Sequence, residues 1–144
     1  MTKQEVDEFL TKAHVFYVAT VDWKGTPKVR PFGAHVYEDG ELYFMTMKLS
    51  NKVHKQMKRH RKIEICAYAD QDKREWIRLS GKVKFVKDRD LVLKFMSAAP
   101  PAAQKHMAHP AFSFVASKLV HPFILEDATV SYCNFFKKPK VTKW

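Results

Sequence analysis

The sequence predicts an α+β fold, mainly β, in which a six-stranded antiparallel sheet curls into a small barrel with flanking helices. Six segments have the composition of β-strands or alternate between apolar and polar residues as β-strands do. Short turns join several of these segments, and glycines occur within strands and at bends. The 144 residues contain no internal repeat, low-complexity segment or linker. One domain over residues 1–144 is therefore expected.

Three helices are expected beside these strands. Thr2 and Glu5 have the spacing of a capping box, followed by apolar residues that recur at helical intervals up to Ala13. A second helix is expected to open near residues 50–51 and to run to about Arg59. A third begins after Asp88, which has the character of an N-cap.

The strands are justified by composition and by the turns between them. The predicted strands are His14–Val21, Pro27–Tyr37, Glu41–Thr46, Ile63–Ala69, Glu75–Val86 and Pro122–Phe136. Turns at Gly25 and at Asp39-Gly40 predict that the first three form an antiparallel meander. Gly33, inside the second strand, indicates a bulge or a close backbone approach. Residues 109–121 show no readable period, and residues 137–140 lead into a basic tail.

Composition limits the class of protein. The chain carries 26 basic and 15 acidic residues, a formal net charge of +11, which favours anionic ligands or nucleic acid. The mean hydropathy of −0.38 is typical of a soluble protein, and no apolar run is long enough to span a bilayer. The N-terminus lacks a signal-peptide core, and Cys66 and Cys133 suggest no disulfide framework. A cytoplasmic protein is expected.

The stretch from Thr46 to Lys52 predicts a phosphate site. It reads as a strand end, a loop, and a helix that opens at Ser50 or Asn51. Free amides and the positive end of the helix dipole favour an anion at such a terminus, and the Thr46 and Ser50 hydroxyls and the Lys52 ammonium add to them. The alternative is an ordinary capped helix whose lysine is solvated.

The strand Glu75–Val86 predicts an interface. Its alternation places Ile77 and Leu79 on a core face and Trp76 and Arg78 on the other face. Trp and Arg are enriched in interfaces and binding sites. We therefore expect the outer face of this strand to contact a ligand or a partner.

The order and spacing of five short segments resemble the split-barrel flavoproteins related to pyridoxamine 5'-phosphate oxidase, which bind FMN. The segments are Tyr17–Thr20, Gly25–Pro31, Asp39–Thr46, Ser50–Lys52 and Trp76–Gly81. With their connections they cover residues 2–136. The resemblance implies an antiparallel split β-barrel and a homodimer with two FMN sites at the subunit interface.

The resemblance also implies which residues contact FMN. They are Arg30, Pro31, Phe32, Gly33, His35, Thr46, Ser50, Asn51, Lys52, Trp76 and Arg78. Arg30 matches the arginine near the flavin phosphate and ribityl chain, and the backbone of residues 31–33 would lie along the isoalloxazine ring. Trp76 and Arg78 match positions that reach the cofactor from the neighbouring subunit.

Three departures argue against true pyridoxamine-phosphate oxidase activity. His35 stands where the family oxidases have lysine, and Trp76 stands where they have glutamine. The C-terminal motif that binds the vitamin substrate is not recognisable in Phe135–Trp144. An FMN-dependent reductase or oxidase of unknown substrate is the better expectation, with a nicotinamide as electron donor and no catalytic side chain assigned.

Other readings of the sequence stay open. His35 could ligate haem, which some members of this fold handle. The cluster of cations on and after the second helix could bind nucleic acid, although it lacks the interleaved aromatics of single-strand binders. A structural dimer without a cofactor is a third alternative. His106 and His109 lack accompanying ligands, so no metal site is expected.

Overall fold

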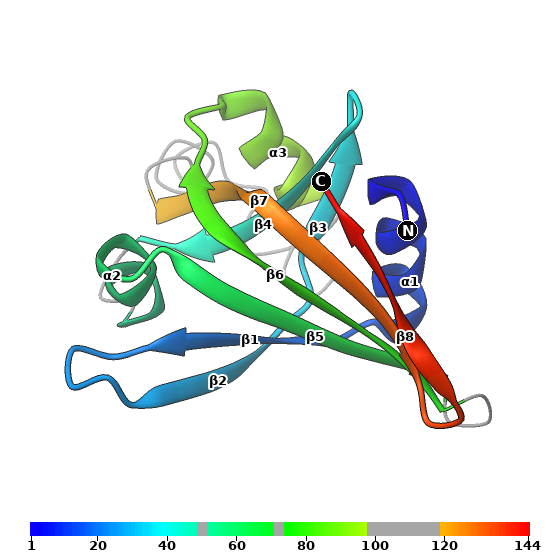
Figure 1. The fold of residues 1–144 in the computed structure, drawn as a ribbon. Coiled ribbons are helices and arrows are strands. Elements are labelled where there is room, and N and C mark those ends of the chain that lie inside the picture. The colour runs from blue at the N-terminus through cyan, green and yellow to red at the C-terminus, as the bar shows by residue number, and fades with distance from the viewer. Residues whose placement is uncertain (49–51, 71–73, 98–118) are drawn as a thin grey trace.

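The computed structural model describes residues 1–48, 52–70, 74–97 and 119–144, and these form three helices and eight strands (Figure 1). In chain order the elements are α1 (Lys3–Ala13), β1 (Phe16–Val21), β2 (Pro27–Phe32), β3 (His35–Glu38), β4 (Glu41–Met47), α2 (Lys52–Arg59), β5 (Lys62–Asp70), β6 (Glu75–Phe85), α3 (Arg89–Ser97), β7 (Val120–Asn134) and β8 (Lys137–Lys143).

All neighbouring strands are antiparallel and belong to one curled sheet. The strand order is β2-β1-β5-β6-β7-β4-β3, with β8 paired to β7. The consecutive strands β2 and β3 therefore stand at opposite ends of this path, and the curl of the sheet lets a short link join them (Figure 1). The predicted class, a mainly β antiparallel split barrel with flanking helices, is confirmed.

The predicted second strand, Pro27–Tyr37, is divided in two. It breaks at Gly33 and Ala34 into β2, which pairs with β1, and β3, which pairs with β4. The predicted three-stranded meander is therefore wrong. The predicted close approach at Gly33 is correct, because a Cβ built there would lie 3.3 Å from the backbone oxygen of His14.

The predicted basic tail also forms a strand, which brings the count among the described residues to eight rather than six. β8 pairs with β7, and its side chains are mostly exposed. Lysines and Pro139 suit an exposed strand at the edge of a sheet, where they discourage pairing with another chain. The composition that suggested a tail is thus the composition of an edge strand.

The first helix forms as predicted. The backbone N–H of Glu5 donates to Thr2 Oγ1 at 3.1 Å, and the N–H of Thr2 donates to Glu5 Oε2 at 2.7 Å. Val6 and Leu10 are fully buried, and the helix packs against β3, β4 and β5. The capping box therefore fixes the start of a helix whose apolar face covers one side of the curled sheet.

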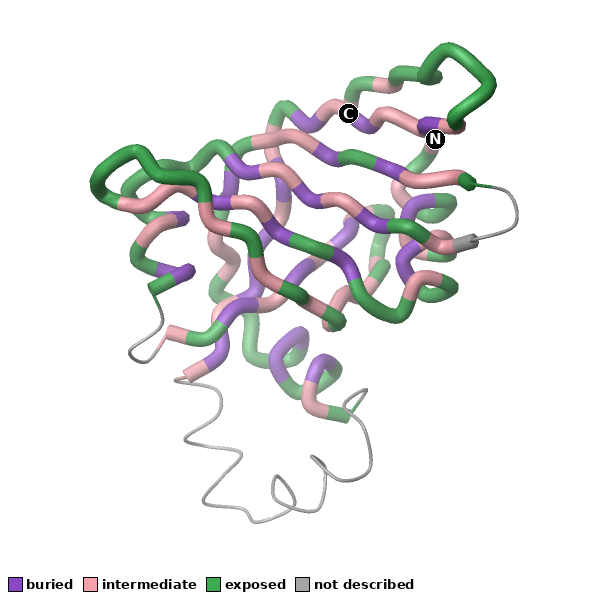
Figure 2. Tube along the Cα trace, turned by 90° about the horizontal axis from the view of Figure 1, so that it is seen from below, coloured by how far each residue is buried: buried purple, intermediate pink, exposed green. Residues whose placement is uncertain are grey.

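Aromatic rings fill the inside of the curl. The Phe44 ring lies 5.7 Å from the Phe16 ring and 5.6 Å from the Phe123 ring, centroid to centroid. Buried positions alternate with more exposed ones along the strands (Figure 2). Complete burial of one such ring stabilises a fold by about 1.5–3 kcal/mol, so this cluster is a major source of stability.

Candidate functional site

An arginine at the sheet edge is held beside α2 by two buried or half-buried side chains. Arg30 of β2 donates from Nη1 to Thr20 Oγ1 at 3.1 Å, and the Thr20 hydroxyl donates to Gln56 Oε1 at 2.7 Å. Thr20 is 2% exposed and links β1 to α2. Within the described part of the chain Arg30 has no carboxylate partner, so its other N–H groups are available to an anion.

Lys52 lies on the same side of α2 as Gln56. It is the first residue of the helix, and residues four apart on a helix share a face. Lys52 is exposed and forms no ion pair with any described residue. The structure thus places two predicted phosphate ligands, Arg30 and Lys52, on one side of α2. Ser50 and Asn51, predicted with them, lie outside the described residues.

Thr46, the remaining predicted phosphate ligand, belongs to a different cluster. It is 3% exposed, its Oγ1 has no hydrogen-bond partner among the described residues, and it stands opposite His121 in the β4–β7 ladder. His121 Nδ1 lies 3.0 Å from His54 Nε2 of α2. The sequence did not reveal this pair, because His54 sits on an otherwise apolar helix face and His121 ends the segment without a readable period.

The histidine pair is neutral at pH 7. Burial and the nearby Lys58 and Lys48 lower the pKa of His54. Burial, with Lys48, His54, Lys58 and Lys87, lowers the pKa of His121 to about 4. The His121 ring also stacks on Phe85 at a centroid distance of 4.4 Å. One proton therefore bridges the two rings, and the nearby lysines disfavour the binding of a second proton.

His35 connects two elements of the scaffold. Its Nδ1 lies 2.8 Å from Asp7 Oδ1 of α1, and its side chain is only 11% exposed. The ring makes an edge contact with Phe16, 6.0 Å between centroids, and the Phe32 ring lies at the same centroid distance from Phe16. His35 and Phe32 therefore have a structural role: they hold α1, β2 and β3 against the core.

Trp76 and Arg78 lie on the outer face of the sheet together with Pro31. The outer row runs across neighbouring strands through Pro31, Tyr17, Cys66, Arg78, Ser131 and Val141. Arg78 Nε donates to Glu64 Oε1 at 2.6 Å, and this bond lowers the pKa of Glu64. Trp76 contacts Phe135, with 5.1 Å between ring centroids. Arg30, one residue before Pro31, points to the inner face.

The part of the chain that the structure describes contains neither a group of side chains that could hold a metal ion nor a membrane-spanning helix. No group of three or more His, Cys, Asp or Glu side chains could hold a metal ion there. His106 and His109 lie outside the described residues. None of the described helices is long and apolar enough to cross a membrane.

Comparisons with known proteins agree with the curled sheet. The family model for pyridoxamine 5'-phosphate oxidase matches residues 2–120. A solved NimC/NimA family protein from Clostridium acetobutylicum is 27% identical, with a TM-score of 0.80, over 99% of this chain and 92% of that one. None of the curated protein sequences matches this chain.

More distant solved structures share the fold alone. A pyridoxamine 5'-phosphate oxidase-related, FMN-binding protein from Nostoc punctiforme is 15% identical, with a TM-score of 0.62, over 98% of this chain and 95% of that one. A haem-binding protein from Mycobacterium smegmatis is 13% identical, with a TM-score of 0.66, over 98% of this chain and 57% of that one.

Proposed function

Because the chain belongs to the pyridoxamine 5'-phosphate oxidase family, we propose that it binds FMN and works as a flavin-dependent oxidoreductase on a small molecule. The observation that carries the proposal is Arg30, which buried Thr20 and half-buried Gln56 fix beside α2 with no carboxylate to neutralise it among the described residues. The FMN-binding protein from Nostoc punctiforme, which shares the fold, supports this choice of cofactor.

The residues present fit a flavin phosphate. Arg30 and Lys52 would face the phosphate from β2 and from the first turn of α2, on the helix side that carries Gln56. Charge-assisted hydrogen bonds from two cations are strong, and the backbone N–H groups at the start of α2 add the partial charge of the helix dipole. Thr20 acts on the site by positioning Arg30.

FMN, when bound, supplies redox chemistry, for which we propose a reduced nicotinamide as the electron donor. The side chains contribute position and charge. His35 supports a substrate other than pyridoxamine phosphate: it replaces the lysine of the family oxidases, and its Nδ1 is occupied by Asp7.

We propose that a second copy of the chain covers the outer face of β1, β2 and β8. Tyr17 is 51% exposed there, Val29 62% and Val141 60%. Large apolar side chains gathered on one face mark an interface.

Trp76 and Arg78 share this face, which supports their predicted contact with FMN across a homodimer. Light scattering should give a dimer for the wild type and for Tyr37→Glu, and a monomer for Tyr17→Glu. A dimeric Tyr17→Glu would refute this interface.

The two cysteines support a location in the cytoplasm. Cys66 and Cys133 are both free, and burial raises the pKa of each thiol, so neither is a reactive thiolate at pH 7. Free thiols are typical of a reducing compartment.

The phosphate ligands are tested by titrating the protein with FMN and following the flavin fluorescence. Arg30→Gln and Lys52→Gln should each weaken FMN binding about tenfold, because each removes a charge-assisted hydrogen bond. Lys58→Gln is the matched control, since Lys58 approaches the histidine side of the same helix. If Arg30→Gln binds FMN as tightly as the wild type, the proposed phosphate site is wrong.

A further inference from the structure

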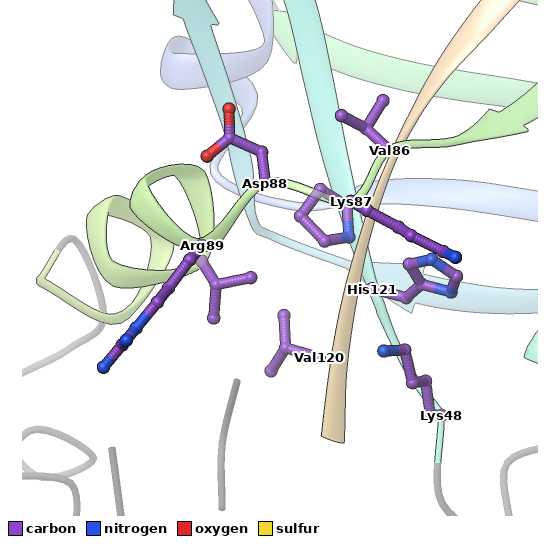
Figure 3. A pocket seen from close by; sticks show the side chains of 9 residues that line it. Lys48, Val86, Lys87, Asp88, Arg89, Val120 and His121 are labelled. Atoms are coloured by element: carbon purple, nitrogen blue, oxygen red, sulfur yellow. The ribbon is translucent and has the colours of Figure 1, made fainter. Parts of the chain in front are cut away.

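A cavity of about 290 Å³ lies beside the first residues of β7, next to the loop that leads from β6 into α3 (Figure 3). Its lining residues are Lys48, Val86, Lys87, Asp88, Arg89, Val92, Val120, His121 and Pro122. None of them belongs to the cluster of Arg30, Thr20 and Gln56. His54, which contacts His121, is two residues from Gln56 and so about 200° away around α2. The cavity and Arg30 therefore lie on different sides of that helix.

The cavity is strongly basic. Lys48, Lys87 and Arg89 line it, and none of the three forms an ion pair with a described residue. Asp88 is the acidic residue of the lining. Its Oδ1 accepts hydrogen bonds from the backbone N–H groups of Asp90 at 2.8 Å and Leu91 at 3.1 Å, so this carboxylate is engaged in capping α3. Asp88 keeps its negative charge, so against three cations the described lining of the cavity carries a net charge of two positive.

His121 supplies a hydrogen-bond donor at the same place. Its ring lies between the ammonium ends of Lys87 and Lys48 (Figure 3). The Nε2 atom is buried and has no hydrogen-bond partner in the described part of the chain, whereas Nδ1 contacts His54 Nε2. If His54 donates in that contact, His121 is the tautomer with its proton on Nε2. A neutral ring of this kind can donate to an anion.

We propose that this cavity binds a small oxyanion with a short apolar body, either a carboxylate or a phosphate monoester. Lys48 and Lys87, on either side of the His121 ring, attract the charged end, and His121 donates one hydrogen bond to it. The Arg89 guanidinium points away from these groups and adds only to the positive field of the cavity (Figure 3). Val86, Val92, Val120 and Pro122 offer apolar contact to the rest of the ligand. The volume lies at the lower end of the range for small-molecule sites, which limits the ligand to a small metabolite. This site is independent of the proposed flavin site.

Isothermal titration of the full chain with phenyl phosphate, benzoate and benzyl alcohol tests the proposal. At least one of the two anions should bind at one per chain, and neutral benzyl alcohol should not bind. Saturation by phenyl phosphate alone would identify phosphate monoesters as the class, and saturation by benzoate alone would identify carboxylates. Lys87→Gln should weaken binding about fivefold, since Lys87 is an exposed cation in a partly screened position, and Arg89→Gln should weaken it less, since the Arg89 guanidinium points away from His121.

Two controls separate this site from the flavin site. Lys12→Gln removes one exposed charge from α1 and should leave anion binding unchanged. Lys87→Gln should leave FMN affinity unchanged, and bound anion should raise the pKa of His121 in a side-chain NMR titration. The inference is overturned if neither anion saturates, if the two variants bind as tightly as the wild type, or if FMN displaces the anion one for one.

Discussion

Acidification should destabilise the protein through the hydrogen-bonded pair His54 and His121. In the unfolded chain the pKa of His121 is near its ordinary value of 6.5, whereas the pKa in the folded protein is about 4. Between these values the unfolded state binds more protons than the folded state. The free energy of unfolding therefore falls as the pH falls from about 6.5 towards about 4, and this loss is absent above 6.5.

The size of the effect follows from the shift. Lowering the pKa from 6.5 to about 4 corresponds to about 3.4 kcal/mol when fully expressed, at about 1.36 kcal/mol per pH unit. Between pH 7 and pH 5 about half of this, about 1.8 kcal/mol, is lost. His121 is only partly buried, and solvent screening reduces that loss to roughly 1 kcal/mol. His54 adds to the loss in the same direction, because its pKa is also lowered.

Urea unfolding at pH 7 and pH 5, in a buffer without phosphate or carboxylate, measures this loss. His121→Phe keeps a ring on Phe85 but removes one titrating group, so its stability should fall by roughly 1 kcal/mol less than that of the wild type between the two pH values. His60→Gln, at the exposed end of α2, is the matched control and should behave like the wild type. An equal loss in His121→Phe and the wild type would show that protonation of His121 does not cause the loss of stability.

Three further substitutions test the scaffold. Gly81→Ala would place a Cβ 3.0 Å from Leu125 Cβ, so overpacking should lower the free energy of unfolding by about 1–3 kcal/mol. Thermal unfolding measures this loss, and an unchanged melting temperature would contradict the tight packing at Gly81. Thr2→Ala removes the N-cap of α1 and should cost about 1 kcal/mol in urea unfolding while FMN affinity stays the same. Thr20→Val leaves Arg30 without its acceptor and should weaken FMN binding several-fold in a fluorescence titration. Wild-type affinity would remove Thr20 from the proposed site.

Local signals in the sequence predicted the elements well. The capping box of Thr2 and Glu5 gave the start of α1, because both of its hydrogen bonds lie within four residues. Asp39-Gly40 gave the hairpin between β3 and β4, and both residues take the positive φ values, 49° and 79°, that this turn requires. The break after Phe32 was not predictable. The strand-like composition continues through it, and the change of partner is decided by strands far along the chain.

The candidate site was predictable only in part. Lys52 followed from the pattern of a helix start after a strand, and Arg30 followed from the family resemblance; the structure places both on one side of α2. The hydrogen bond between Thr20 and Gln56 was not predicted, because the two residues are 36 positions apart in the sequence. The contact between His54 and His121 was not predicted either, because these residues are 67 positions apart. Tertiary packing brings such residues together, and neither the composition nor the spacing of the sequence indicates which residues will pair.

FMN binding by this chain can be tested with a visible absorption spectrum of the purified protein, recorded before and after addition of FMN. We expect a flavin band that shifts on binding and saturates at one FMN per chain. A spectrum that never departs from that of free FMN would contradict FMN binding. A Soret band in its place would favour the haem alternative and would also contradict it.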